Sequence, residues 1–320
     1  MRARYFNNII KKDNVVTKSS TDIYKIKSEF KYYYLLPEEL RKFYVKPYNY
    51  RENENEALYD MDYAGITLFE FLNTSIIHTD GETFDKAIDL VIKQLKEYFI
   101  LKSKYNKIVS NDNFILNKVL NRIDKLKKLP EYRNLNLFLN MTNTNLDELV
   151  SSFKDDYNNI NELNVTKTIS HGDLHFSNIL INEETFEIKF IDVRGAMHED
   201  DLYIDQYYDY AKLAHSIQGL YDYIVNDEFK LKLTDNLDTY NIEFHIYTRL
   251  ISEYYVKIWD SVCKDLINDN DYEIIRIYTK SLFLSMLPLH KENLKHILAF
   301  IKISDNIPII SSDKLSINYK

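Results

Sequence analysis

The sequence predicts an α+β protein in which a small, strand-containing N-terminal part precedes a larger helical part. Three observations lead to this prediction. Short β-branched and aromatic runs gather before residue 65. Apolar residues recur at helical spacing over most of the chain after residue 83. Two short apolar runs flank one polar stretch at residues 171–178. The expected domains are therefore an N-terminal lobe at residues 1–64 and a C-terminal lobe at residues 65–320.

The bulk composition is that of an ordinary soluble globular chain. Of its 320 residues, 45% are hydrophobic and 28% are charged, and a chain of this length buries a substantial core. The net charge of −8 argues against nucleic-acid binding, which normally needs a basic surface. The single cysteine, Cys263, excludes an intrachain disulfide and a cysteine-based zinc cluster. Because no signal segment and no run of about eighteen apolar residues occurs, we expect a cytoplasmic protein without membrane insertion.

The first elements predict a strand, a turn, a second strand and a helix. Residues 5–10 and 15–18 form the expected β-hairpin, and residues 22–34 form the expected helix, with Glu29 in its middle. A strand lysine such as Lys18, paired with a helix glutamate, holds its amine toward the phosphates of a nucleotide. The alternative is that both residues are ordinary exposed charges.

A third strand is expected at residues 57–63, followed by a turn at Gly65. Thr67 and Glu70 then match a capping box at the start of a short helix. A strand, a glycine turn and a capped helix are typical of a hinge between two lobes. Backbone groups of residues 62–64 (Asp62, Tyr63 and Ala64) could hydrogen-bond a purine edge there, although a simple connection between domains fits the same pattern.

The middle and the end of the chain predict helices. Apolar residues at helical spacing predict a core-facing helix from residue 83 to about residue 100. Further helices are expected at residues 113–129, 146–163, 241–266 and 271–286, with little strand signal after residue 192. The short β-branched run at residues 166–170 leads into the polar stretch.

That polar stretch reads His171-Gly172-Asp173-Leu174-His175-Phe176-Ser177-Asn178, and Phe190-Ile191-Asp192 follows a second apolar run. It therefore supplies an aspartate, an asparagine and a second aspartate between short strands. Phosphoryl transfer from a nucleotide needs these groups, because one carboxylate orients or deprotonates a hydroxyl. The amide oxygen and the other carboxylate hold Mg²⁺ against the triphosphate.

Several other motifs are missing. The sequence has no G-x-x-x-x-G-K-[ST], no G-x-G-x-x-G and no G-x-S-x-G, which argues against a P-loop, a Rossmann unit and an α/β-hydrolase. His171 and His175 have a metal-compatible spacing only in a helix, and here Gly172 and short strands predict a loop. Any phosphate cover would have to come from the glycine-free hairpin at residues 7–14.

Taken together, these residues resemble the aminoglycoside phosphotransferase/choline kinase-like family of the protein-kinase-like superfamily. The segments that carry the resemblance, within about residues 5–220, are HGDLHFSNILI, FEIKFIDVRG, VVTK, YDMDYAGITLFEFL and YYDYAKLAHS. The resemblance implies a bilobal protein-kinase-like fold with a small β-containing N-lobe and a larger helical C-lobe. The IDVRG ending and the short N-terminal segment look closest to bacterial members linked to capsule or surface-polysaccharide gene clusters.

The resemblance also implies a role for each residue of the polar stretch. Asp173 matches the catalytic aspartate, and His171 matches the histidine that braces its loop. Asn178 and Asp192 match the Mg²⁺ ligands. Asp209 matches a residue that supports the catalytic loop.

On the nucleotide side, Lys18 matches the phosphate-contacting lysine, Glu29 its helix partner, and residues 62–64 the hinge. Three features depart from the pattern. The N-lobe begins almost at the hairpin, and its nucleotide loop has no glycine. Arg194-Gly195 stands where protein kinases have Phe-Gly, which points away from protein kinases.

The leading hypothesis is a Mg²⁺-dependent phosphotransferase that moves the γ-phosphate of ATP or GTP to a hydroxyl of a small molecule. The acceptor would be a sugar, an amino alcohol or a polysaccharide precursor. The alternative is a pseudokinase that binds a nucleotide or a partner without turnover. The acidic residues at 199–205 would suit a cationic acceptor, but such a run is also typical of a solvated surface. The oligomeric state stays open.

Overall fold

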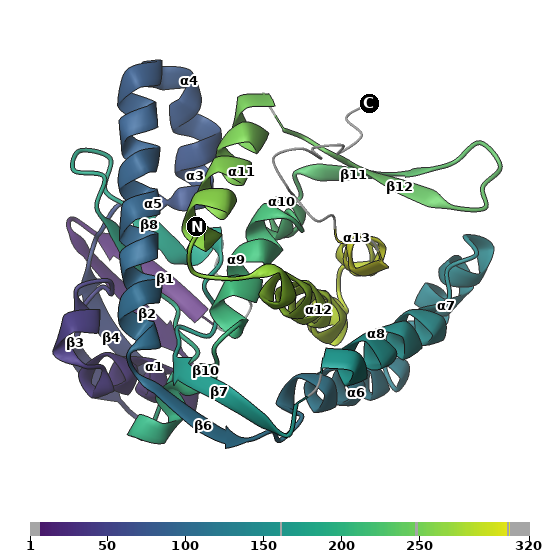
Figure 1. Cartoon of the computed structure of the whole chain (residues 1–320), viewed down its shortest axis with the longest axis horizontal. Coiled ribbons are helices and arrows are strands. Elements are labelled where there is room, and N and C mark those ends of the chain that lie inside the picture. The colour runs from purple at the N-terminus through teal and green to yellow at the C-terminus, as the bar shows by residue number, and fades with distance from the viewer. Residues whose placement is uncertain (1–6, 161, 247–248, 306, 308–320) are drawn as a thin grey trace. The chain divides into compact units, whose positions relative to one another are not determined.

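The computed structural model describes residues 7–160, 162–246, 249–305 and 307, which form two compact units (Figure 1). Unit 1 comprises Met1–Ile108 and Thr166–Asp209, and unit 2 comprises Val109–Val165 and Tyr210–Lys320. The chain passes between the units three times, within strand β6 (Asn106–Ser110), strand β7 (Asn164–Ile169) and helix α9 (Tyr208–Ile217). The lobes expected at residues 1–64 and 65–320 divide the chain differently from these two units, and that division stays a prediction.

The predicted α+β organisation is confirmed, since antiparallel strands dominate the N-terminal region and helices the C-terminal region. The N-terminal sheet has the order β1-β2-β4-β3. Its strands are β1 (Asn7–Lys12), β2 (Val15–Ser20), β3 (Pro47–Glu52) and β4 (Ala57–Asp62). The predicted hairpin is confirmed over its described part, while Tyr5 and Phe6 lie outside the described residues. Strand β3 was not predicted, because the register shift between Tyr48 and Arg51 interrupts its side-chain alternation.

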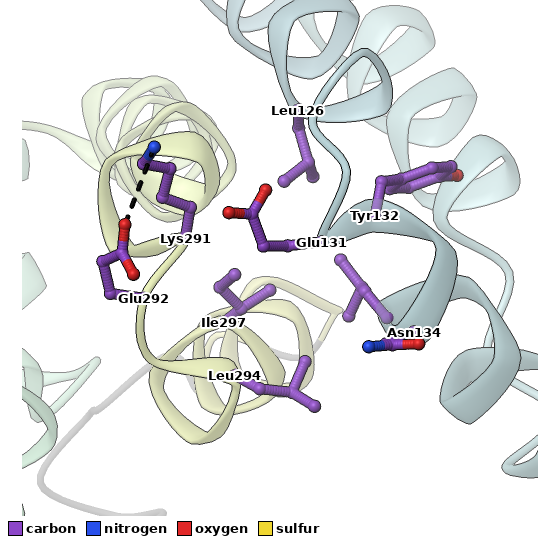
Figure 2. Close-up of a pocket in the computed structure, with 9 residues that line it drawn as sticks. Leu126, Glu131, Tyr132, Asn134, Lys291, Glu292, Leu294 and Ile297 are labelled. Atoms are coloured by element: carbon purple, nitrogen blue, oxygen red, sulfur yellow. Dashed lines mark ion pairs between the residues drawn. The ribbon is translucent and has the colours of Figure 1, made fainter.

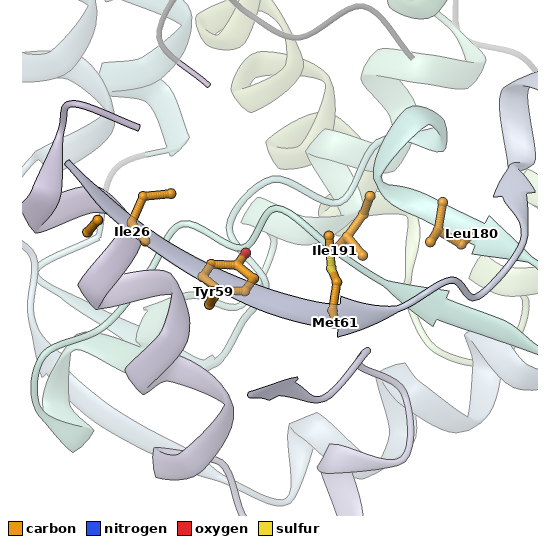
Figure 3. Close-up of a cluster of buried hydrophobic side chains, with 6 residues drawn as sticks. Ile26, Tyr59, Met61, Leu180 and Ile191 are labelled. Atoms are coloured by element: carbon orange, nitrogen blue, oxygen red, sulfur yellow. The ribbon is translucent and has the colours of Figure 1, made fainter. Parts of the chain in front are cut away.

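Helix α1 (Ile23–Leu35) begins where the Asp22 side chain accepts a hydrogen bond from the backbone N–H of Lys25. The helix contacts β2, β3 and β4. A core cluster joins α1 to strand β4 and to more distant parts of unit 1, and its buried members are Ile26, Ala57, Tyr59, Met61, Leu180 and Ile191. Figure 3 shows this cluster. Burial of such side chains contributes about 1.5–3 kcal/mol each, which holds α1 on the sheet.

The chain then turns sharply at Gly65, with φ at +122°. A Cβ added there would lie 2.0 Å from the carbonyl oxygen of Ile181, so only glycine lets the two segments pass. The predicted capping box of Thr67 and Glu70 is confirmed. The remaining elements of unit 1 up to β6 are α2 (Glu38–Arg41), β5 (Ile66–Thr67), α3 (Leu68–Glu70), η1 (Phe71–Ser75), α4 (Ile76–His78) and α5 (Gly81–Ser103).

Two further small sheets frame the polar stretch. One has the order β5-β8-β9, with β8 (Ile179–Ile181) and β9 (Ile188–Phe190), and the other has the order β10-β7-β6, with β10 (Tyr203–Asp205). The 3₁₀ turns η2 (Phe176–Asn178) and η3 (Glu199–Leu202) complete this part. The polar stretch therefore lies between strands, as predicted.

Unit 2 is organised around helix α12 (Asp269–Met286), whose second half is buried and which packs against α6, α8 and α13. The elements of this part are α6 (Phe114–Lys127), α7 (Tyr132–Met141), α8 (Leu146–Ile160), α9 (Tyr208–Ile217), α10 (Tyr221–Val225), β11 (Phe229–Leu233), β12 (Tyr240–Phe244), α11 (Arg249–Cys263), η4 (Leu287–His290) and α13 (Leu294–Asp305).

The helix expected at residues 241–266 is wrong at its start. Tyr240–Phe244 is a strand that pairs antiparallel with β11, and of the described residues in the expected range only Arg249–Cys263 is helical. The run alternates apolar and polar residues, which is the period of a half-buried strand rather than of a helix. The expectation of little strand structure after residue 192 is therefore also wrong.

Among the helices of the described residues, none combines the length and the apolar character that crossing a bilayer requires.

Candidate active site

The polar stretch forms a loop that begins where β7 ends and runs from His171 to Asn178, and because the sequence predicts a catalytic role for it, these residues are called the catalytic loop below. Gly172 has φ at +79°, and a Cβ there would lie 2.7 Å from the Cβ of Arg194, so the position requires glycine. The Asn178 amide nitrogen donates to the Asp173 carbonyl oxygen at 2.9 Å. This bond closes the loop on itself and fixes Asp173, whose side chain is 23% exposed. A carboxylate is thereby held in place yet open to a ligand.

His171 joins this loop to the segment that carries Asp192. Its ring is fully buried, its Nδ1 accepts from the Asp173 backbone N–H at 3.1 Å, and its Nε2 lies 2.9 Å from the Ile191 carbonyl oxygen. Since a carbonyl only accepts, Nε2 carries the proton. Burial lowers the pKa of His171 and outweighs the opposing effect of Asp209. The ring is therefore a neutral link between the two loops.

Asp209 holds the first two residues of the catalytic loop through their backbone N–H groups. Its buried carboxylate accepts from the backbone N–H groups of His171 at 3.0 Å and Gly172 at 2.9 Å. Lys102 and Tyr98, both on α5, also donate to it, at 2.9 Å and 3.1 Å. Burial alone would raise the pKa of Asp209, but Lys102 and His171 hold it below its ordinary value. The carboxylate is ionised and fully bonded.

Lys102 was not predicted from the sequence. It lies in a run of polar residues near the end of α5 and resembles an ordinary exposed helix charge. The structure buries it, and its Nζ also donates to the Ser170 hydroxyl at 3.0 Å. Only the tertiary partner distinguishes it from the other lysines of that helix.

Lys18 lies at the centre of a second buried charge cluster. Its Nζ donates to Glu29 Oε2 at 2.6 Å and to Asp192 Oδ1 at 2.5 Å. The Tyr59 hydroxyl donates to the same Glu29 oxygen at 3.2 Å. Burial alone would lower the pKa of Lys18, but Asp192, Tyr59 and Glu29 together hold it well above its ordinary value. The structure thus brings the predicted Lys18, Glu29 and Asp192 together around one ammonium group.

Asp192 differs from the other members of this cluster because part of it reaches solvent. Its side chain is 33% exposed, and its φ of +59° is a left-handed conformation that is uncommon for aspartate. Burial raises the pKa of Asp192, but Lys18 outweighs it and keeps the pKa below its ordinary value. The result is an ionised carboxylate with room for a further ligand.

Asn178 and Asp192, the predicted Mg²⁺ ligands, lie on two segments that a backbone hydrogen bond joins. The backbone N–H of Ile191 donates to the Asn178 carbonyl oxygen at 3.1 Å, which ties the two segments together. Because the Asn178 amide nitrogen is used by the loop, its Oδ1 is the atom left for a cation. Mg²⁺ keeps several waters and takes its other ligands from one or two protein groups and phosphates. No cluster of three His, Cys, Asp or Glu side chains suited to a metal occurs among the described residues.

The residues predicted to form the hinge, Asp62–Ala64, lie at the C-terminal end of strand β4. The backbone N–H of Tyr63 donates to the Asn14 carbonyl oxygen at 2.9 Å, so this donor is already used. The exposed Asp62 side chain accepts from the Tyr48 hydroxyl at 2.9 Å. One backbone donor of residues 62–64 is therefore occupied, and their contact with a purine edge stays a prediction.

The turn of the hairpin lies at this hinge end, because Val15 pairs with Asp62 while Lys18 pairs with Tyr59. The expectation that the hairpin at residues 7–14 covers the phosphates stays a prediction. A cation–π contact lies at the predicted hinge, where Lys11 Nζ is 3.1 Å from the centroid of the Tyr63 ring.

Helix α1 carries a polar stripe that the sequence analysis did not identify as a unit. Its members follow the one-face spacing i, i+3, i+4 and i+7: Lys25, Ser28, Glu29 and Tyr32. The Tyr32 hydroxyl donates to the Ser170 carbonyl oxygen at 3.0 Å, directly before the catalytic loop. Helical spacing among polar residues is the signal that could have revealed the stripe.

Ser28, in the same stripe, holds the segment after Asp192. Its carbonyl oxygen accepts from the backbone N–H of Ala196 at 3.0 Å. Gly195 has φ at +90°, and a Cβ there would lie 2.3 Å from the Ser28 hydroxyl oxygen. Helix α1 therefore contacts the β2 lysine, the residue before the catalytic loop and the segment of Asp192.

The acidic run at residues 199–205 is occupied by local contacts. Asp201 accepts from the backbone N–H groups of Met197 at 2.9 Å and His198 at 3.0 Å, and Asp200 pairs with Lys107 at 2.6 Å. These bonds favour the surface interpretation of the run over a site for a cationic acceptor.

Unit 2 contains a cavity of about 160 Å³, shown in Figure 2. Its lining mixes apolar side chains with the charged groups of Glu131, Lys291 and Glu292, and the last two form an ion pair at 3.6 Å. None of the predicted site residues lines it.

Comparisons with known proteins find likenesses only among solved structures. Neither the protein-family models nor the curated proteins give a match to the sequence. An aminoglycoside phosphotransferase of Streptomyces rimosus, in complex with ADP and streptomycin, is similar with a TM-score of 0.49 and 13% identity, over 84% of this chain and 86% of that chain. An ethanolamine kinase of Plasmodium vivax is similar with a TM-score of 0.47 and 13% identity, over 93% of this chain and 78% of that chain.

Solved structures similar to this chain thus include an aminoglycoside phosphotransferase and an ethanolamine kinase. TM-scores below 0.5 assign neither a fold nor an activity. The function is therefore argued from this chain's own residues.

Proposed function

We propose that this protein transfers the γ-phosphate of ATP or GTP to a hydroxyl group of a small molecule, with Mg²⁺. The observation that carries the proposal is the cluster in which Lys18 bonds both Glu29 and Asp192. The adjoining loop holds Asp173 and Asn178. A buried lysine, a helix glutamate, two aspartates and an asparagine are the parts that kinases use for phosphoryl transfer.

In this proposal Lys18 binds the phosphates of the nucleotide, and Glu29 orients it. Asn178 Oδ1 and Asp192 would hold Mg²⁺, which when bound neutralises charge on the phosphates. Separation of the Lys18–Asp192 pair would give the lysine a donor for a phosphate oxygen and the aspartate a free oxygen. The left-handed backbone and partial exposure of Asp192 are consistent with this second use.

Asp173 would orient the acceptor hydroxyl and take its proton. Its carboxylate is partly exposed, while its backbone is fixed through His171 and Asn178. Positioning and electrostatic stabilisation supply most of the rate in such a reaction, so no covalent intermediate is needed.

The base would lie against the apolar side chains that surround Met61. The core cluster of Figure 3 includes Met61, Leu180 and Ile191, and the partly buried Val16 and Ala64 pack against it. The Asp62 carbonyl and the Ala64 N–H lie at the end of the same strand and would meet the purine edge. ATP and GTP both satisfy this arrangement.

We also propose that the chain is a distant member of the aminoglycoside phosphotransferase/choline kinase-like family, acting in the cytoplasm on a sugar, an amino alcohol or a polysaccharide precursor. The order and spacing of His171, Asp173, Asn178 and Asp192 support the family. The link to capsule gene clusters stays a prediction.

A nucleotide-binding thermal shift, followed by a turnover screen, tests the proposed function. We expect Mg·ATP or Mg·GTP to raise the melting temperature and EDTA to remove most of the effect. A screen of small hydroxyl compounds should then yield a phosphorylated product. Asp173→Ala should abolish turnover and keep the thermal shift, because the residue contacts the acceptor and not the nucleotide.

The outcomes separate the proposal from its alternative. Absence of any Mg²⁺-dependent shift would contradict nucleotide binding altogether. A clear shift with no turnover across the hydroxyl compounds would instead support the pseudokinase.

A further inference from the structure

Lys25 lies one helical turn before Glu29 on helix α1, and its Nζ lies 3.7 Å from Glu29 Oε1. Lys18 occupies the other oxygen of the same carboxylate. The Lys25 side chain is 40% exposed, whereas the Glu29 side chain is 2% exposed. One buried carboxylate therefore lies between a buried ammonium group and an accessible one.

Glu29 Oε1 is buried and accepts no hydrogen bond from the described residues. The distance of 3.7 Å to Lys25 is too long for a hydrogen bond, so the contact is an ion pair only. The four neighbouring groups form a row of alternating charge: Lys25, Glu29, Lys18 and Asp192. With Lys25 the row is neutral, and without it the row carries one net negative charge.

The stability of helix α1 does not account for a lysine at this position. Lys25 lies in the first helical turn, where the helix dipole disfavours a positive charge. A lysine placed four residues before a glutamate is also the weaker order for a pair on a helix. The charge therefore opposes the local preference of the helix.

Lys25 also acts on the residues around Lys18. Burial raises the pKa of Asp192, Lys18 lowers it strongly, and Lys25 adds to the lowering. Burial likewise raises the pKa of Glu29, and Lys25 opposes that rise together with Lys18. The field of Lys25 thus reaches both carboxylates that bond Lys18.

We propose that Lys25 is a second cation of the phosphate site, which balances Glu29 and leaves the charge of Lys18 for the nucleotide phosphates. The inference rests on the proposed function and deepens it. Lys25 is a positioning residue, since it acts through Glu29 and Lys18. Its effect depends on the phosphates of the ligand and not on the base.

The test compares Lys25→Met with Lys27→Met, a matched control on the same helix. Lys27 is 35% exposed and pairs with Glu52 at 3.0 Å, away from the charge row. Calorimetric titration with adenosine, Mg·ADP and Mg·ATP measures binding to each variant. Melting temperatures establish that both variants fold.

For Lys25→Met we expect about 3- to 5-fold weaker binding of Mg·ATP, since half-exposed ion pairs are worth this much. Mg·ADP should lose less and adenosine nothing. Lys25→Arg should restore binding, and high salt should shrink the difference. Lys27→Met should bind all three ligands as the wild type does.

Three results would overturn the proposal: unchanged Mg·ATP binding to Lys25→Met, an equal loss of adenosine binding, or an equal loss in Lys27→Met. Lys25→Gln repeats the titration if the methionine variant does not fold. A wild-type protein that binds no Mg·ATP would contradict the proposed function itself, which is a separate outcome.

Discussion

Unit 1 contains two buried lysines that each bond an aspartate from a distant segment, and the two pairs differ in what the aspartate has left to offer. Lys102 bonds Asp209, and Lys18 bonds Asp192. The ammonium groups are buried in both cases. The Asp209 side chain is fully buried, whereas the Asp192 side chain is 33% exposed.

The difference lies in spare bonding capacity. Asp209 accepts hydrogen bonds from Lys102, Tyr98 and the backbone of the catalytic loop, so its oxygens are saturated. Asp192 has a bond from Lys18 and an exposed edge. The same two residue types therefore form a pair that supports the loop, Lys102–Asp209, and a pair that we propose binds a ligand, Lys18–Asp192. We call the first the saturated pair and the second the open pair. Exposure and unfilled oxygens distinguish the two pairs.

The largest expected effect is on stability, at the saturated pair. Lys102→Met leaves the buried carboxylate of Asp209 without its charge partner, which costs about 3–5 kcal/mol. Urea unfolding measures the loss. Lys86→Met is the matched control on the same helix, since Lys86 is 67% exposed, and it should stay within about 0.5 kcal/mol of the wild type. Equal stabilities for the two variants would break the contrast.

The next effect concerns activity, at the open pair. Asp192→Ala removes a proposed metal ligand and should reduce turnover by about 10²–10³-fold, while Lys18 keeps its bond to Glu29 and the fold persists. A Mg²⁺ titration of the turnover rate checks this. Asp200→Ala, at an exposed surface carboxylate, should leave the titration unchanged. A variant at Asp192 with the Mg²⁺ dependence of the wild type would contradict the assignment.

The sequence predicted the open pair better than the saturated one, for a physical reason. Asp173, Asn178 and Asp192 lie in one stretch of chain, and their types and spacing already describe the chemistry. Lys18 and Glu29 are separated by one strand end and one cap, so local structure alone brings them near each other.

The partners that support the loop depend on tertiary packing instead. Lys102 and Tyr98 meet Asp209 across more than a hundred residues. Neither has a local signal, because a lysine and a tyrosine on an amphipathic helix fit many environments. The strands β3 and β12 were missed or misread for the same kind of reason, since a register shift and a five-residue alternation are weak patterns.

A smaller effect is expected where helix α1 touches the segment after Asp192. Gly195→Ala places a Cβ 2.3 Å from the Ser28 hydroxyl in a left-handed conformation, which costs about 1–3 kcal/mol. Gly81→Ala is the control, because a Cβ there meets nothing within 4 Å. Melting temperatures compare the two, and adding Ser28→Gly should recover part of the loss. If the Gly195 variant were as stable as the Gly81 variant, the Ser28 side chain could move aside at no cost and the close approach would not constrain the fold.

The smallest effect is a pH dependence at Asp209. Its pKa in the folded chain is below the ordinary 3.8, so the unfolded chain binds the proton first as pH falls. The stabilisation by the ionised group is complete well above pH 4 and is lost through the folded pKa. The gap in unfolding free energy between the wild type and Asp209→Asn should therefore narrow in acid, by at most about 1.4 kcal/mol per pH unit. If the difference in unfolding free energy widened in acid, the pKa of Asp209 in the folded chain would be raised and not lowered.

The most direct test of the Lys18–Asp192 centre is a crystal structure of the protein with Mg²⁺ and a non-hydrolysable ATP analogue. We expect the ion at about 2.0–2.1 Å from Asn178 Oδ1 and an Asp192 oxygen, with the analogue's phosphates on Lys18. The Lys18–Asp192 bond, at 2.5 Å here, should then be open or lengthened. An analogue bound elsewhere, with that bond intact and no metal between Asn178 and Asp192, would contradict the account.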